Sequence, residues 1–208
     1  MIPGSTLIVK APGCQNPVKF STIASGNTFG AVYWTDGKRD ARMLPDEPWL
    51  RKSPSEGVMF WSDECEEIGQ IDFCSRGSEK PEWEDLDYAV EPSEDDYVVA
   101  LQSGLVSTPE KERYIRMRLW WRGNDPIRRG EITELSVAHQ DNLKCFEAIL
   151  SEGDDNQRLM KAEVLRHLSR FDDALRLLDS EFPETYSHAV QRIRDLVLRS
   201  DYKVATLT

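Results

Sequence analysis

The pattern of apolar and polar positions divides the chain into a β-rich first part and a helical second part. In the first 75 or so residues, short apolar or β-branched runs are separated by glycine and proline, which is typical of strands joined by turns. Asp36 and Gly37 together predict a hairpin turn. The expected strands are residues 6–10, 18–23, 28–35, 41–44 and 57–61.

In the second part, apolar residues recur at spacings of three and four, which is the period of a helix. Thr108, Pro109 and Glu110 predict the start of a helix, and Gly123 predicts its end. Further helices are expected at 141–150, 155–168, 171–179 and 183–199. We therefore expect an α+β fold. It would have a β-rich ribbon-like module at 1–75, an acidic linker or loop at 76–107 and a helical bundle at 108–208.

Residues 161–179 carry the most regular helical pattern of the chain. Small and apolar residues stand on both sides of a tight turn at Ser169 and Arg170, namely Ala162, Leu165, Phe171, Ala174, Leu177 and Leu178. This segment resembles a tetratricopeptide-type helical hairpin, with Ser169 at the usual turn glycine. One such unit cannot bury its apolar face alone, so we expect it to pack on neighbouring helices. The hairpin could then be scaffold or supply a groove for a partner.

Two short turns near the N-terminus have the spacing of zinc-binding knuckles. Residues 11–14 read Ala-Pro-Gly-Cys and residues 53–56 read Ser-Pro-Ser-Glu, where a knuckle has Cys-Pro-x-Cys. This part resembles a zinc ribbon that has lost its metal, because of the four ligand positions only Cys14 remains and zinc needs four ligands. We expect no metal and no other cofactor. Two further stretches, residues 22–31 and 119–125, are recognisable. On these stretches and the helical part, the chain resembles a group of bacterial proteins that join such a metal-free ribbon to a tetratricopeptide-like C-terminus.

The charge of the chain is concentrated in one stretch. The 208 residues include 37 acidic and 26 basic side chains, a net charge of −11. Residues 62–97, the acidic belt, hold 14 of the acids and two bases, so this stretch carries −12. Such a stretch repels phosphate backbones and attracts a basic protein. The residues expected to bind that partner are Glu82, Trp83, Glu84, Asp85, Asp87, Tyr88, Glu94, Asp95 and Asp96. The alternative interpretation is a solvated loop that aids solubility.

A basic stretch at 110–129 raises the alternative of nucleic-acid binding. It has seven bases and three acids, and it contains Trp120 and Trp121, so arginine and aromatic groups could stack on bases. The same stretch has helical apolar spacing, which favours a helix with a core face and an outer row of arginines. We therefore expect no direct contact with nucleic acid.

Motifs for catalysis are missing from the sequence. It has no phosphate-binding glycine loop, no dinucleotide fingerprint and no nucleophile elbow, and its three histidines, His139, His167 and His188, are far apart. We expect no enzyme and no catalytic residue. The expected function is protein binding, most concretely that of an immunity protein that neutralises a bacterial toxin, for instance a nuclease, through the acidic surface. The alternative is a scaffold or adaptor that binds a peptide or protein through the tetratricopeptide-like helices.

The sequence also predicts a compartment. No apolar run approaches the roughly 20 residues of a membrane span, and the first residues lack the pattern of a secretory signal. Four scattered cysteines are too few for a disulfide scaffold. We therefore expect a cytoplasmic protein with reduced thiols and no membrane contact, and the sequence does not indicate its oligomeric state.

Overall fold

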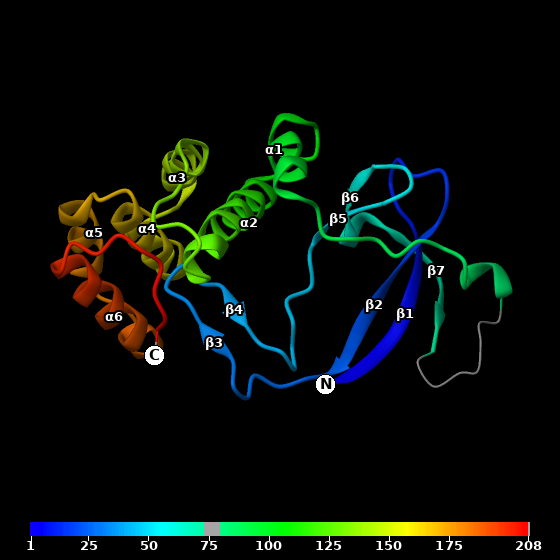
Figure 1. The fold of residues 1–208 in the computed structure, drawn as a ribbon, viewed down its shortest axis with the longest axis horizontal. Helices are drawn as coiled ribbons and strands as arrows, with labels where there is room; N and C mark the ends of the chain where they lie inside the picture. Colours follow the sequence, from blue (N-terminus) through cyan, green and yellow to red (C-terminus); the bar gives the residue numbers. More distant parts are fainter. Residues whose placement is uncertain (73–79, 208) are drawn as a thin grey trace. The chain divides into compact units, whose positions relative to one another are not determined.

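The computed structural model describes residues 1–72 and 80–207, and it has the expected α+β fold (Figure 1). The chain forms two compact units. Unit 1 comprises Met1–Ala31 and Asp40–Asp96, and unit 2 comprises Val32–Arg39 and Tyr97–Thr208. These bounds differ from the expected ones in two ways. The described part of the acidic belt up to Asp96 belongs to the β-rich unit, and a short hairpin from the N-terminal part belongs to the helical unit.

Unit 1 is built on a three-stranded antiparallel sheet in the order β2-β1-β7. Its strands are β1 (Ile2–Lys10), β2 (Val18–Ser25) and β7 (Glu66–Ile71), and Val9 of β1 pairs with Val18 of β2. A second hairpin pairs β5 (Leu50–Lys52) with β6 (Met59–Trp61). Two short 3-10 turns follow, η1 (Ser62–Glu64) and η2 (Pro81–Trp83). The β-branched and aromatic residues of these strands supply the core, which includes Val9, Val18, Phe20 and Phe60.

Unit 2 is helical apart from one hairpin. The hairpin joins β3 (Val32–Tyr33) to β4 (Arg39–Asp40), and its turn contains Gly37 with a φ of +79°, as Asp36-Gly37 predicts. Helix α1 (Glu94–Gln102) begins at the end of unit 1. It is followed by α2 (Pro109–Arg128), α3 (Val137–Ile149), α4 (Asp155–His167), α5 (Phe171–Leu178), the 3-10 turn η3 (Glu184–Tyr186) and α6 (Ser187–Leu198).

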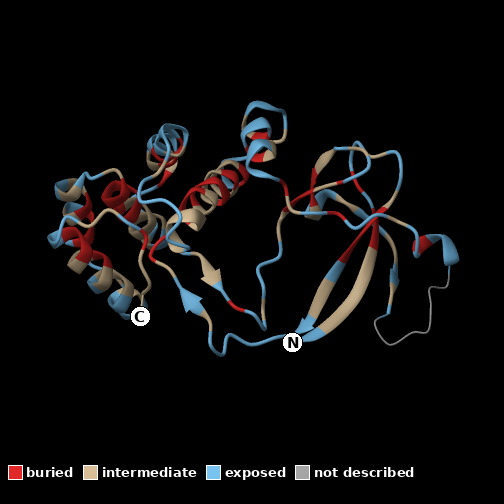
Figure 2. Cartoon of the chain, in the orientation of Figure 1, coloured by how far each residue is buried: buried red, intermediate tan, exposed pale blue. Residues whose placement is uncertain are grey.

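The hairpin expected at 161–179 is present as α4 and α5. Ser169 adopts a φ of +59° at the turn, so it takes the left-handed conformation for which glycine is the usual residue. Figure 2 shows that buried residues are dense in both helices. The small side chains of Ala162 and Ala174 lie in one cluster with residues of α6, so α6 completes the burial that a single hairpin cannot achieve.

Helix α2 does not end at Gly123, as the sequence predicts, but continues to Arg128. Two contacts from other elements explain the extension. A Cβ at Gly123 would lie 2.5 Å from the ring of His139, so glycine is needed there for close packing of α3. The next residue, Asn124, is buried and donates a hydrogen bond of 2.7 Å to Asp36 in the β3–β4 hairpin. Tertiary packing therefore outweighs the weak helix propensity of glycine.

Other elements differ from expectation at their ends. Strand 28–35 is reduced to β3, and 41–44 is not a strand. Helix α1 lies in a part expected to be linker, and its signal is a capping box: the Ser93 hydroxyl accepts from the Asp96 N–H, and the Asp96 carboxylate accepts from the Ser93 N–H. Among the described residues, no helix has both the length and the apolar character needed to cross a bilayer.

Candidate functional site

The described end of the acidic belt, residues 80–96, is attached to the strands of unit 1, and we call it the acidic segment. The Lys19 N–H donates to the carbonyl of Asp87 at 3.0 Å, and the Ala89 N–H donates to the carbonyl of Lys19 at 2.8 Å. Further along, Lys52 and Val90 exchange two backbone hydrogen bonds of 2.9 Å each. The acidic segment is therefore not a free linker, because its backbone extends the edges of β2 and β5.

The buried side chain of Trp83 anchors the acidic segment to strand β7. It is only 8% exposed and packs on Gly69 of β7, where a Cβ would lie 2.0 Å from the indole ring. The ammonium of Lys19 donates to the carbonyl of Glu84 at 2.6 Å and to that of Trp83 at 3.3 Å. Trp83 was expected on the contact surface, but in this chain it is a core residue that holds the neighbouring carboxylates in place.

Most of the other expected contact residues are exposed. Tyr88 is 51% exposed, with the Lys19 ammonium 4.7 Å from its ring centroid. Asp96 differs, because it forms a 2.7 Å ion pair with Lys52 and caps α1 through Ser93. Burial tends to raise the pKa of Asp96, but the hydrogen bonds from Lys52 and Ser93 outweigh it and hold that pKa below its usual value. The exposed carboxylates are Glu82, Glu84, Asp85, Asp87, Glu94 and Asp95.

The division of charge between the two units is extreme. Unit 1 contains 18 acidic and seven basic side chains, a formal charge of −11, whereas unit 2 contains 19 of each and is neutral. Over residues 1–72 and 80–207, no ion pair joins Glu82, Asp85 or Asp87 to a basic side chain. Within this part of the chain, the charges of these three carboxylates are therefore not neutralised by ion pairs.

The two turns that resemble zinc knuckles face each other without a metal ligand set. The Glu56 carboxylate accepts hydrogen bonds from the backbone N–H groups of Gln15 and Asn16 at 2.8 and 2.9 Å, which lowers the pKa of Glu56. Burial raises the pKa of Cys14, and it raises that of Cys65 to about 11, so neither thiol is poised as a nucleophile. In the described parts of the chain, no three potential ligands come together. Cys74 lies outside the described residues.

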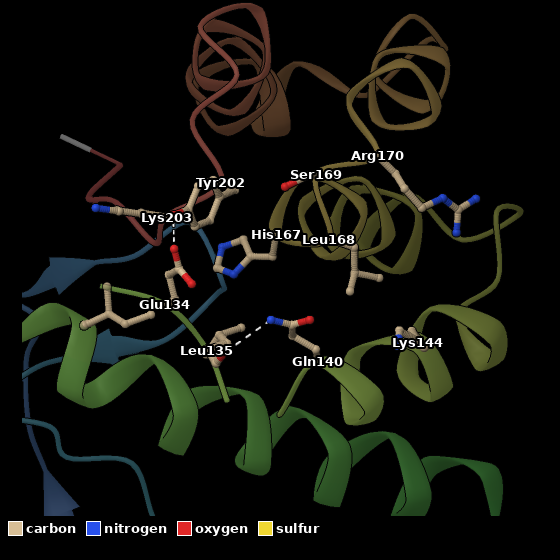
Figure 3. Close-up of a pocket in the computed structure, with 11 residues that line it drawn as sticks. Glu134, Leu135, Gln140, Lys144, His167, Leu168, Ser169, Arg170, Tyr202 and Lys203 are labelled. Atoms are coloured by element: carbon tan, nitrogen blue, oxygen red, sulfur yellow. Dashed lines mark hydrogen bonds between the residues drawn. The ribbon is translucent and has the colours of Figure 1, made fainter. Parts of the chain in front are cut away.

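Unit 2 contains a pocket of about 590 Å³ at the turn between α4 and α5 (Figure 3). Its apolar lining includes Leu135, from the segment before α3, and Leu168 at the end of α4. Tyr202, from the segment after α6, forms another wall, and its hydroxyl lies 3.5 Å from a carboxylate oxygen of Glu134. The Gln140 amide faces the cavity and donates to the carbonyl of Leu135 at 3.2 Å.

The rim of this pocket is cationic. Lys144, Arg170 and Lys203 line it, against the single carboxylate of Glu134. Lys144 pairs with Asp141 on its own helix at 2.7 Å, and Arg170 pairs with Asp173 at 2.7 Å and with Glu147 at 3.4 Å. Lys203 is exposed, and its ammonium has no ion-pair partner among residues 1–72 and 80–207. Figure 3 shows the Arg170 and Lys203 side chains directed away from His167, on opposite sides of the pocket.

His167 lies at the centre of the pocket lining, but its ring is fully engaged (Figure 3). Indole N–H groups only donate, so His167 Nδ1 accepts from Trp120 Nε1 at 3.3 Å, and Nε2 then carries a proton toward Glu163 Oε1 at 3.1 Å. Glu163 also binds Arg166 at 2.5 Å, and both side chains are fully buried. The histidine is thus held in a structural network and has no free nitrogen for proton transfer.

Arg166 connects this network to the C-terminal segment. Its guanidinium donates to the carbonyl oxygens of Asp201 and Lys203, which precede and follow Tyr202. Three residues after Tyr202, the carbonyl of Ala205 accepts a backbone hydrogen bond of 2.8 Å from the N–H of Thr35. The pocket wall formed by Tyr202 is therefore fixed from two sides within unit 2.

No sequence motif predicts this pocket, although the 161–179 hairpin was considered as a possible groove. Its lining comes from α2, the segment before α3, α3 itself, the end of α4 with the α4–α5 turn, and the segment after α6, and no single stretch carries a motif. The unusual Ser169 at the hairpin turn was the one local signal near it. Comparisons of the chain with protein-family models, with curated proteins and with solved structures found no match.

Proposed function

We propose that this protein captures a basic protein partner through the exposed carboxylates of the acidic segment. The observation that carries the proposal is that unit 1 has a formal charge of −11, whereas unit 2 is neutral. A surface with such a charge excess raises the association rate with an oppositely charged protein. The backbone hydrogen bonds to Lys19 and Lys52 support it further, because they order the main chain that carries the carboxylates and so reduce the backbone entropy lost on association.

The concrete form of the proposal is an immunity protein that neutralises a bacterial toxin. A nuclease is the toxin class that fits this charge best, since a nuclease active site holds phosphates and is therefore basic. A group of carboxylates on an anchored backbone can occupy such a site in place of the nucleic-acid backbone. Tyr88, half exposed among the carboxylates, provides an aromatic contact of the kind that dominates protein interfaces.

The test begins with co-expression of the tagged full chain and the products of neighbouring reading frames. For a product that co-purifies, association rates are measured by stopped-flow at several salt concentrations. A fourfold variant with Glu82, Glu84, Asp85 and Asp87 changed to lysine should associate roughly tenfold or more slowly and lose its salt dependence. The matched control changes four exposed acids of unit 2 to lysine, Asp141, Asp172, Glu181 and Glu184. Equal rates for the two variants would overturn the proposal.

A further inference from the structure

The pocket in unit 2 points to a second binding activity, separate from the acidic segment. We propose that it binds a small organic carboxylate, whose apolar body occupies the cavity and whose carboxylate lies at the cationic rim. The proposal goes beyond protein capture and does not depend on it, because every residue that lines the pocket belongs to unit 2.

The size of the pocket and its apolar lining determine the kind of body that fits. A volume of about 590 Å³ lies within the range of small-molecule sites, roughly 300–1,000 Å³. Leu135, Leu168 and the ring of Tyr202 offer apolar contacts on different sides. The hydroxyl of Ser169 has no hydrogen-bond partner in the described chain, so it is available to a polar atom of the ligand. An aromatic or branched aliphatic group matches this lining.

The charge of the rim determines the sign of the polar end. The lining has three cationic side chains and one carboxylate. Acids outside the lining pair with Lys144 and Arg170, so Lys203 is the cation that favours an anion over an ammonium group. Lys203 has no competing ion pair among the described residues, and the Lys144–Asp141 pair is exposed and therefore weak. The ammonium groups of Lys203 and Lys144 can therefore donate to a bound carboxylate with little loss of existing interactions. Such charge-assisted hydrogen bonds are about twice as strong as neutral ones.

Hydrogen bonds hold the walls of the pocket in a fixed position. Arg166 fixes the backbone on both sides of Tyr202, and His167 is locked by Trp120 and Glu163. A preformed site loses little entropy when it is filled, which is the condition under which a small ligand binds measurably. The locked histidine also means that the site binds its ligand without acid–base chemistry from His167.

The experiment uses 3-phenylpropanoate as the probe and the full chain in an NMR titration that follows the Gln140 side-chain amide and the Ser169 backbone amide. We expect saturable shifts of both signals. The neutral isostere 3-phenylpropanamide should bind roughly tenfold more weakly, and 2-phenylethylammonium should not shift either signal. A second series with the peptide Ac-EEEE-NH2 tests whether negative charge alone suffices, and we expect no saturation.

Variants assign the effect to the pocket. Lys203→Met and Lys144→Met should each weaken 3-phenylpropanoate binding by about fivefold or more, whereas Arg199→Met, which removes an exposed charge of unit 2 outside the lining, should change it less than about twofold. Gln140→Trp should fill the cavity and abolish the Ser169 shift. The proposal is overturned if the acid and the amide bind equally, if Lys203→Met matches Arg199→Met, if the acidic peptide alone saturates the site, or if 10 mM probe produces no shift.

Discussion

At the scale of single residues, the most consequential feature is the ion pair of Glu163 and Arg166. Neither side chain reaches solvent, and the pair makes hydrogen bonds of 2.5 and 2.7 Å. Arg166 has further carbonyl partners in the C-terminal segment, and Glu163 has His167. A buried pair adds little stability compared with apolar residues, but removing one partner leaves an uncompensated charge in the core. The sequence did not indicate that this pair is buried, because an acid and an arginine three positions apart on a helix are usually a surface pair.

We expect Glu163→Gln to lower the free energy of unfolding by about 3–5 kcal/mol, because Arg166 keeps its charge and loses its carboxylate. Urea unfolding followed by circular dichroism measures the change. The control is Glu131→Gln, which breaks an exposed pair with Arg129 and should cost about 0–1 kcal/mol. A similar small cost for both variants would show that Arg166 is solvated in solution.

The same carboxylate predicts a pH dependence with a definite sign. Burial tends to raise the pKa of Glu163, but the buried Arg166 guanidinium outweighs it, so the folded-state pKa lies below the usual value. The stabilisation is therefore present above the unfolded-state pKa of about 4.3 and is lost as the pH falls below it toward the folded-state pKa. Between about pH 5 and pH 3, the wild-type protein should lose more unfolding free energy than Glu163→Gln. Parallel curves for the two proteins would contradict this assignment.

At the scale of elements, contacts between elements decide where α2 ends. The β3–β4 hairpin places the buried Asp36 carboxylate against Asn124 and Arg128, and Trp121 Nε1 donates to the Asp36 carbonyl at 2.9 Å. These contacts hold the last two turns of α2, beyond the residue at which local signals predict a stop. Sequence periodicity therefore predicted the helices themselves well, as for α4 and α5, but could not predict ends that depend on a distant hairpin.

Gly123 tests this explanation, because helix propensity and packing predict opposite effects of replacing it. Alanine is favoured over glycine in a helix interior by about 1 kcal/mol. Packing opposes it, since the new Cβ would lie 2.5 Å from the His139 ring, and overpacking typically costs about 1–3 kcal/mol. We expect Gly123→Ala to destabilise the protein. In the double variant with His139→Ala the glycine replacement should become neutral or stabilising, and chemical denaturation of the four proteins gives the coupling energy. Additive effects would exclude the steric explanation.

At the scale of the whole molecule, the sequence predicted the distribution of charge better than the division into units. The count of acids in residues 62–97 was enough to find the negative part of the chain. It could not show that Trp83 would be buried on Gly69, because glycine in a strand and tryptophan in an acidic stretch carry no mutual signal. The hairpin of Val32–Arg39 joins unit 2 for a similar reason, since its partners Asn124 and Arg128 lie far along the chain.

The unequal charge of the two units predicts that salt stabilises them to different extents. Like charges on unit 1 repel one another, at about 0.4 kcal/mol for each exposed pair 10 Å apart, and salt screens this repulsion. Raising sodium chloride from 0.05 to 0.5 M should increase the free energy of opening in unit 1 by about 1 kcal/mol more than in unit 2. Native-state hydrogen exchange measures both units in one sample, at the amides of Ile8 and Val9 in β1 and of Leu165 and Leu177 in α4 and α5.

Unit 2 is the internal control for other effects of salt, because it is in the same solution but has no net charge. The fourfold lysine variant of the acidic segment reduces the charge of unit 1 from −11 to −3. In this variant, most of the difference between the salt responses of the two units should disappear. If the difference survives, repulsion among these carboxylates is not the cause of the salt response of unit 1.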